Sequence, residues 1–125
     1  TTFVGYFIGS PAMNLFETEA SSNDSVKINN TIIKTHTNLS NLKDKKIKLG
    51  IRSEFIKIAK NQSENLLNVD VDKIEDLGNY KLLTAKMGNL TIKSKINRET
   101  EIPSSDVKLY IPAEKCCVYE EEKLI

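Results

Sequence analysis

The chain has 125 residues, 39% of them hydrophobic and 28% charged, which suffices for one domain with its own core and is too short for two ordinary domains. Its 18 basic and 17 acidic side chains give a formal net charge of +1, which argues against a surface that binds nucleic acid through its phosphates. No apolar run approaches the roughly 18 residues of a membrane-spanning helix, so we expect no direct membrane insertion.

The first predicted element is a short helix followed by a hinge. Apolar residues of the opening segment TTFVGYFIG recur at the spacing of one helical face: Phe3, Val4, Phe7 and Ile8. Gly9 suits the left-handed exit of a helix, and Pro11 prevents the helix from continuing. Because two helical turns do not persist alone in water, we expect this helix to lie on a protein surface.

From Met13 onward the apolar period is two, which is typical of strands with one buried face. Asn29-Asn30 predicts a tight hairpin turn, and a change of parity after Val71 predicts a bulge near Asp72 and Lys73. No βαβ alternation is present, so the sequence predicts an all-β, OB-like small barrel with roughly eight or nine short strands and an N-terminal helix. The last six residues, EEEKLI, are expected to form a loose charged tail.

Residues that could carry chemistry are few, so we predict a protein that is not an enzyme by itself. The five glycines include no phosphate-binding loop, and His36 is the only histidine, so neither a histidine metal site nor a catalytic triad is expected. Cys116 and Cys117 are adjacent, hence badly placed to bridge each other. We predict one buried and one exposed strand cysteine, and no catalytic, cofactor or metal residues.

A barrel of this class can also bind single-stranded nucleic acid, which needs aromatic stacking platforms beside basic side chains. The tyrosines that could serve have no arginine next to them in the sequence: Tyr6, Tyr80, Tyr110 and Tyr119. Nucleic-acid binding therefore stays a minor alternative.

Three segments resemble one known family, the ATP-binding subunits of ABC importers for sugars (maltose and multiple-sugar type) and glycerol 3-phosphate. The segment FVGYFIGSPAMN resembles the stretch that leaves the ATPase domain in that family, with Gly9, Pro11 and Asn14 in place. The segments LGIRSEF and VDKIEDLG resemble two later family signatures, in the expected order and spacing. These retain Gly50, Arg52, Glu54, Glu75 and Gly78, whereas Ser53 and Phe55 depart from the usual Pro and His.

The resemblance implies a C-terminal regulatory domain of the TOBE type, an OB-type barrel. Residues 1–12 would be the linker helix and hinge from an ATPase domain, and residues 13–125 the barrel. ATP and Mg²⁺ would bind only in that upstream domain. The resemblance further implies a bacterial cytoplasmic location at the inner face of the cell membrane. Its implied partners are a second copy of the subunit and, through the ATPase domain, the transporter's membrane subunits.

The same resemblance gives a set of family-motif and candidate interface residues: Phe3, Phe7, Ile8, Gly9, Pro11, Asn14, Gly50, Arg52, Glu54, Glu75 and Gly78. From the residues themselves, the two glycines suit bends or turns, and Arg52 could pair with Glu54 or with Glu75 to fix a loop. Direct ligand contact by Arg52 is the other interpretation. An alternative function is a barrel that senses a small oxyanion or metabolite.

Overall fold

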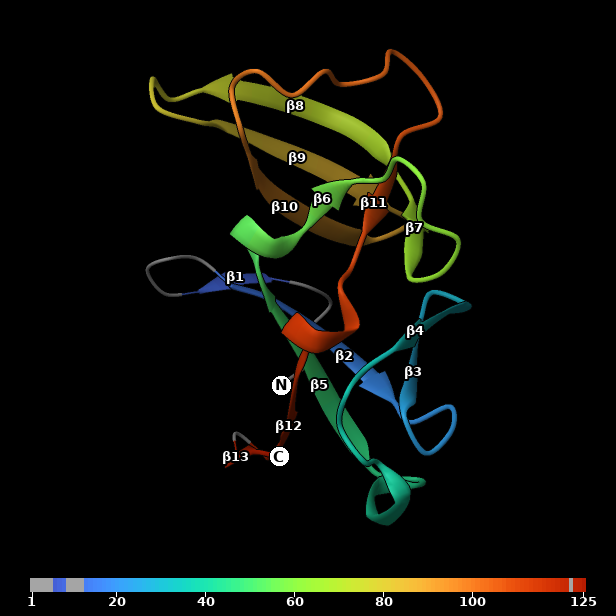
Figure 1. Cartoon of the computed structure of the whole chain (residues 1–125). Coiled ribbons are helices and arrows are strands. Elements are labelled where there is room, and N and C mark those ends of the chain that lie inside the picture. Colours follow the sequence, from blue (N-terminus) through green and yellow to red (C-terminus); the bar gives the residue numbers. More distant parts are fainter. Residues whose placement is uncertain (1–5, 9–12, 122) are drawn as a thin grey trace.

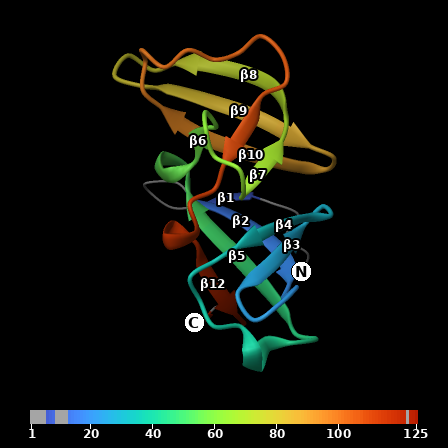
Figure 2. The same cartoon turned by 45° about the vertical axis from the view of Figure 1, so that its right-hand side comes forward.

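The computed structural model describes residues 6–8, 13–121 and 123–125, and residues 6–8 through their backbone alone. Within these ranges the chain forms strands and short 3-10 turns, and no α-helix. Figure 1 shows a three-stranded sheet at one end of the molecule, a five-stranded sheet at the other and a smaller sheet between them. The turned view in Figure 2 keeps this order. The all-β class predicted from the sequence is confirmed.

The five-stranded sheet is the larger of the two end layers. It consists, in spatial order, of β1 (Tyr6–Ile8), β2 (Met13–Glu19), β5 (Lys46–Arg52), β12 (Cys117–Glu120) and β13 (Lys123–Leu124). β2 and β5 pair antiparallel over their whole length, with Phe16 opposite Leu49, and Leu49 is in turn opposite Val118 on β12. Opposite residues share a face, so these three buried side chains lie together on the core side of the sheet.

The three-stranded sheet has the order β10-β9-β8 and consists of β8 (Asp70–Asp76), β9 (Lys81–Met87) and β10 (Leu90–Ile96). A two-residue turn, Gly88-Asn89, joins β9 to β10, and Gly88 has a φ of +61°. Asn89 has no positive φ, and a positive φ at the first central position alone is the type II′ geometry that favours glycine. The register of β8 on β9 shifts between Val71 and Lys73, which confirms the predicted bulge at Asp72.

Two smaller sheets complete the fold. The sheet between the two ends consists of β6 (Lys57–Ile58), β11 (Lys108–Tyr110) and β7 (Leu66–Asn68), in the order β6-β11-β7. β3 (Ser25–Ile28) and β4 (Thr31–Lys34) form a hairpin. Its central residues Asn29 and Asn30 have φ values of +46° and +69°, the left-handed pair of a type I′ turn, so the predicted hairpin is confirmed.

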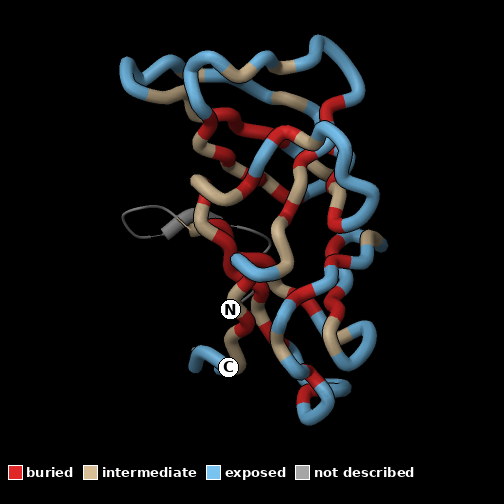
Figure 3. The backbone as a smooth tube through the Cα atoms, viewed as in Figure 1, coloured by how far each residue is buried: buried red, intermediate tan, exposed pale blue. Residues whose placement is uncertain are grey.

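Three single 3-10 turns cap or connect these strands: η1 (Ser40–Leu42), η2 (Ser53–Phe55) and η3 (Ala113–Lys115). The core lies between the sheets, and Figure 3 shows buried residues through the middle of the molecule and exposed ones along the outer loops. The largest fully buried side chains come from nearly every layer: Phe16, Ile33, Leu39, Ile47, Leu49, Ile51, Ile56, Leu67, Leu83, Ile92, Leu109 and Ile111. Each stabilises the fold by about 1.5–3 kcal/mol relative to an exposed position.

Two expectations about the chain ends are wrong. Residues 6–8 are strand β1, antiparallel to β2, and not the end of a helix, while residues 1–5 and 9–12 lie outside the described residues. An apolar spacing of three and four fits a helix, but pairing with the edge of β2 satisfies the backbone of so short a segment better than two isolated helical turns do. The expected loose tail instead pairs with β12 through β13, and the Ile125 N–H donates to the Val118 carbonyl at 2.8 Å.

Among the described residues, no helix has the length and apolar character that a membrane crossing requires.

Candidate functional site

Asn14, from the first family motif, is a buried structural residue. It lies on β2 with an exposed fraction of 2%. Its Oδ1 accepts from the Lys93 N–H at 2.9 Å, and its Nδ2 donates to the Lys93 carbonyl at 2.9 Å. The same Nδ2 is 3.4 Å from the Ile51 carbonyl of β5. Asn14 therefore binds the edge of β10 to the five-stranded sheet, and both of its N–H groups are committed to backbone carbonyls.

Gly50, in the second motif, allows two side chains to pack closely over β5. A Cβ added here would lie 2.9 Å from the Met13 Sδ and 2.9 Å from the Tyr119 Cε2. The Tyr119 hydroxyl is in turn 3.7 Å from the Met13 Sδ. Gly50 thus serves packing on the outer face of the sheet, and not the bend expected from the sequence.

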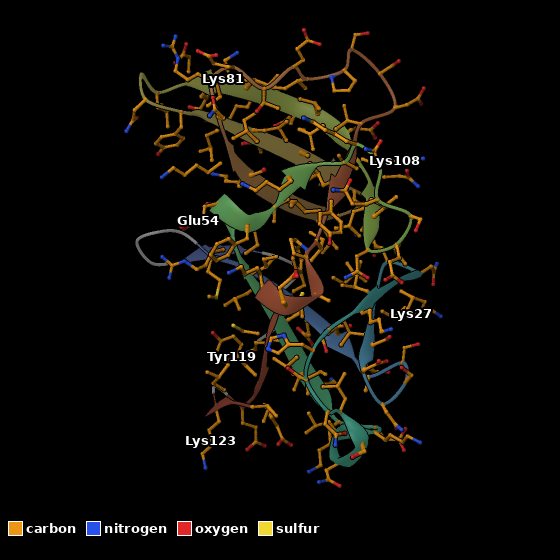
Figure 4. All side chains as sticks on the ribbon, in the orientation of Figure 1. Lys27, Glu54, Lys81, Lys108, Tyr119 and Lys123 are labelled. Carbon is orange, nitrogen blue, oxygen red and sulfur yellow. The ribbon has the colours of Figure 1, made fainter. Side chains whose placement is uncertain are left out.

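Arg52 pairs with Glu54 and not with Glu75. The Arg52 Nε lies 3.3 Å from the Glu54 Oε1, which joins the end of β5 to η2, where Figure 4 labels Glu54. The two side chains are 40% and 36% exposed, so the pair contributes at most about 1 kcal/mol. Glu75 lies on β8 and faces Lys73 at 3.7 Å instead.

The third motif lies in the other end sheet, apart from the first two. Gly78 follows β8 with a φ of +97°, and its N–H donates to the Asp76 Oδ1 at 3.0 Å, which confirms the turn role expected of this glycine. Arg98 donates to the other Asp76 oxygen at 2.8 Å. The Gly78 N–H and, after it, Arg98 lower the pKa of Asp76. The structure brings Asn14, Gly50, Arg52 and Glu54 together, and Glu75 and Gly78 lie elsewhere.

The remaining candidate interface residues belong to the N-terminal segment. Phe3, Gly9 and Pro11 lie outside the described residues, and Phe7 and Ile8 are described through their backbone in β1. Their predicted interface role stays a prediction.

The residues considered for chemistry have structural surroundings. The exposed His36 places its Nδ1 2.9 Å from the Ala113 carbonyl. Cys116 is buried and Cys117 half-buried, and both are free thiols. Burial above all, then Cys117 and Glu114, raises the pKa of Cys116 to about 12, so its thiol is inert at neutral pH. Within the described part of the chain, no three His, Cys, Asp or Glu side chains are grouped to hold a metal.

One surface hollow was not predicted from the sequence. It has a volume of about 560 Å³ and is lined by residues 68–70, 86–88 and 106–108, which we call the lysine hollow. Two lysines, Lys86 and Lys108, and two aspartates, Asp70 and Asp106, stand in it. Each lining segment has an apolar residue between more polar neighbours or a glycine, a pattern too common in strands to indicate a site, and only the fold brings the three together.

A second hollow of about 410 Å³ lies between the β3–β4 hairpin and residues 63–66. Asn65 fixes its wall, with a left-handed φ of +58°. The Asn65 Nδ2 donates to the carbonyls of Lys34 and Ile111, each at 2.8 Å, and its Oδ1 accepts from the Lys34 N–H at 2.8 Å. Both N–H groups of this amide are used in joining β4 to the end of β11, and the other polar side chains that line the hollow are Ser25, Lys34, Ser63 and Glu64.

Comparison with known proteins agrees with this geometry. A family model described as the MalK OB fold domain matches residues 9–56. No curated protein matches the sequence. Among solved structures, the cytoplasmic molybdate-binding protein ModG with molybdate bound is similar with a TM-score of 0.73 and 13% sequence identity, over 86% of this chain and 95% of that chain. At this identity the similarity concerns the fold alone.

The OB-like fold predicted from the sequence is thus confirmed, on the described strands and on both comparisons. The chain is an all-β, OB-like protein whose residues 9–56 match the MalK OB fold domain.

Proposed function

We propose that this chain is the accessory regulatory and dimerisation domain of the ATP-binding subunit of an ABC importer for sugars or glycerol phosphate. The observation that carries the proposal is the match of residues 9–56 to the MalK OB fold domain. That range contains Asn14, Gly50, Arg52 and Glu54, which the fold brings together at the junction of β2, β5 and η2.

In this proposal the domain performs no chemistry. Its barrel presents a surface to a second copy and keeps two ATPase domains in register, while ATP and Mg²⁺ bind to those domains. The membrane subunits are contacted through the ATPase domain, and the assembly sits at the cytoplasmic face of the bacterial membrane. The buried uses of Asn14 and Gly50 support a scaffold role for these motif residues, because Asn14 is buried and bonded to backbone and Gly50 is covered by Met13 and Tyr119.

Deletion in the complete subunit tests this proposal. We expect loss of residues 13–125 to weaken dimerisation, measured by light scattering across protein concentrations, and to alter regulation of transport while ATP binding is retained. Unchanged dimerisation, transport and regulation would show that the assigned role is wrong.

A second candidate function is binding of a small oxyanion or metabolite. The lysine hollow favours it, because Lys86 and Lys108 stand in one depression of about 560 Å³, within the size range of ligand sites. The fold similarity to ModG, which binds molybdate, is consistent with it. Calorimetric titration of the chain with molybdate, sulfate and phosphate tests this function, and the absence of saturable heat for all three would remove it.

A further inference from the structure

The lysine hollow is built from three chain segments that share one pattern. Each segment has an apolar residue in the middle, and Val69 and Val107 are 8% and 5% exposed. Asp70, Lys86 and Lys108 lie in strands, where side chains alternate between faces, so they point away from the core, and Asp106 is exposed in the turn before β11. The exposed polar side chains that line the hollow are Asn68, Asp70, Lys86, Asp106 and Lys108.

Strand pairing sets the relative places of these side chains. Asp70 is directly opposite Lys86 in the β8–β9 pair, and Asn68 is directly opposite Lys108 in the β11–β7 pair. Residues 68–70 therefore cross from one sheet to the next with one lysine on each side. Cross-strand neighbours lie roughly 5 Å apart and residues i and i+2 roughly 7 Å apart, so both ammonium groups can reach one small ligand.

The frame of the hollow is fixed by backbone hydrogen bonds. The Val69 N–H donates to the Val107 carbonyl at 3.2 Å, which joins two of the segments. The third is held by Asn29, whose Nδ2 donates to the Met87 carbonyl at 2.9 Å from the tip of the β3–β4 hairpin. Gly88 leaves room for this contact, because a Cβ there would lie 2.7 Å from the Asn29 Nδ2.

The charged groups of the hollow do not pair with one another or with other described residues. In the described part of the chain, Lys86, Lys108, Asp70 and Asp106 make no ion pair and no side-chain hydrogen bond, although other surface charges do pair, such as Arg98 with Asp76 at 2.8 Å. Figure 4 shows Lys108 near the junction of the upper sheet and β7, away from the labelled Lys27 on β3. Two cations and two acceptor-only groups thus face the same solvent-filled space.

We propose that the lysine hollow binds a phosphorylated polyol or sugar, with the phosphate on Lys86 and Lys108 and the hydroxyl groups on Asp70 and Asp106. The inference rests on the second candidate function above and names its ligand class. A phosphate monoester carries a charge of roughly −1.5 to −2 at pH 7, which matches two ammonium groups. Ionised carboxylates accept hydrogen bonds and cannot donate them, so they fit sugar hydroxyls.

Other small ligands fit less well. An unphosphorylated sugar leaves both lysines without an anion, and an amino acid carries one carboxylate for two lysines. A bare oxyanion satisfies the lysines but offers no hydroxyl group from which the two aspartates can accept. A ligand with both a phosphate and several hydroxyls uses all four side chains.

Titration of the ¹⁵N-labelled chain followed by NMR tests the inference, with glucose 6-phosphate, inorganic phosphate and glucose as probes. We expect saturable amide shifts centred on residues 68–70, 86–88 and 106–108, strongest affinity for glucose 6-phosphate and none for glucose. Lys86→Met and Lys108→Met should each weaken glucose 6-phosphate binding by up to about fivefold, the upper end of the range for an exposed ion pair. Lys27→Met is the matched control and should leave affinity unchanged.

Asp106→Asn separates the two parts of the ligand. Asparagine tolerates the left-handed φ of +55° at this position, so the backbone is retained. The variant removes a negative charge next to the phosphate, and it removes a strong acceptor for hydroxyls. We expect it to strengthen binding of inorganic phosphate and to weaken binding of glucose 6-phosphate.

Three results would overturn the inference. Equal affinity for phosphate and glucose 6-phosphate, with Asp106→Asn strengthening both, would mean that the hollow is a plain anion site. Saturable shifts centred on other residues would place the ligand elsewhere, and in both cases the small-ligand function would stand. Absence of binding for these probes and for molybdate and sulfate would remove the inference and that function together.

Discussion

The side-chain amide of Asn14 on β2 and the backbone of Lys93 on β10 hold each other through a reciprocal pair of hydrogen bonds, each 2.9 Å long. Lys93 lies on an edge strand of the three-stranded sheet, and Asn14 lies within the five-stranded one. A single buried side chain thus continues the hydrogen bonding of one end sheet into the other. The two sheets are thereby joined by polar contacts as well as by the apolar core.

Asn14→Ala should reduce the free energy of unfolding by about 2–4 kcal/mol, because both backbone groups of Lys93 would lose a buried partner. Urea unfolding monitored by circular dichroism measures this change. Asn61→Ala, at an exposed loop position, is the control and should stay within about 0.5 kcal/mol of the parent. An Asn14→Ala protein as stable as that control would show that the reciprocal pair does not stabilise the fold.

Gly50→Ala should destabilise the protein by about 1–3 kcal/mol, the usual cost of overpacking, since the added methyl group meets Met13 and Tyr119 at 2.9 Å. Thermal unfolding gives the value. The cost should fall when Met13 is first changed to Ala, because one of the two obstructing side chains is then gone. Equal costs in both backgrounds would contradict the packing role of this glycine.

Because the Cys116 thiol is buried, the protein should lose stability at alkaline pH. Burial raises the pKa of its thiol from about 9 to about 12, so the folded state holds this proton more tightly than the unfolded state does. The stabilising contribution is fully present below about pH 9 and is lost as pH rises toward 12. Unfolding free energy measured from pH 8 to 11 should fall more steeply for the parent than for Cys116→Ala, and parallel profiles would contradict this.

Removal of Arg98 should reverse only part of the lowering of the Asp76 pKa. The pKa of Asp76 is lowered chiefly by the hydrogen bond from the Gly78 N–H and next by Arg98. In Arg98→Ala the pKa of Asp76 should rise and still remain below its ordinary value, because the Gly78 N–H is retained. Carboxyl carbon shifts followed by NMR during an acid titration report it. A return to the ordinary value in this variant would mean that Arg98 alone is responsible.

Features that depend on neighbouring residues were predicted well from the sequence. Asn29-Asn30 gave the hairpin because few residues other than glycine tolerate two left-handed positions, and the change of parity after Val71 gave the bulge. The error at residues 6–8 arose because a three-residue edge strand is defined by its partner β2 and has almost no pattern of its own. The pairing of β13 with β12 was missed for the same reason, since Lys123 and Leu124 form a strand only beside β12.

The candidate site was predicted only in part, because it depends on contacts between distant residues. The residues themselves left two choices for the partner of Arg52, and the structure selects Glu54, two residues away. The lysine hollow combines segments that are up to about 40 residues apart in the sequence, and nothing within any one of them indicates the other two. The net charge of the chain does not indicate the lysine hollow either, because the charges of its two lysines and two aspartates cancel.

Asn65 meets two demands at once, a backbone in the left-handed region and a side-chain amide that donates two hydrogen bonds and accepts one. Glycine would meet the first demand and glutamine would offer the second, but neither meets both. Evolution therefore has no easy substitute at this position, whereas the exposed loop that precedes it can drift. Among divergent relatives, we therefore expect asparagine to be retained at position 65 even where the neighbouring residues differ.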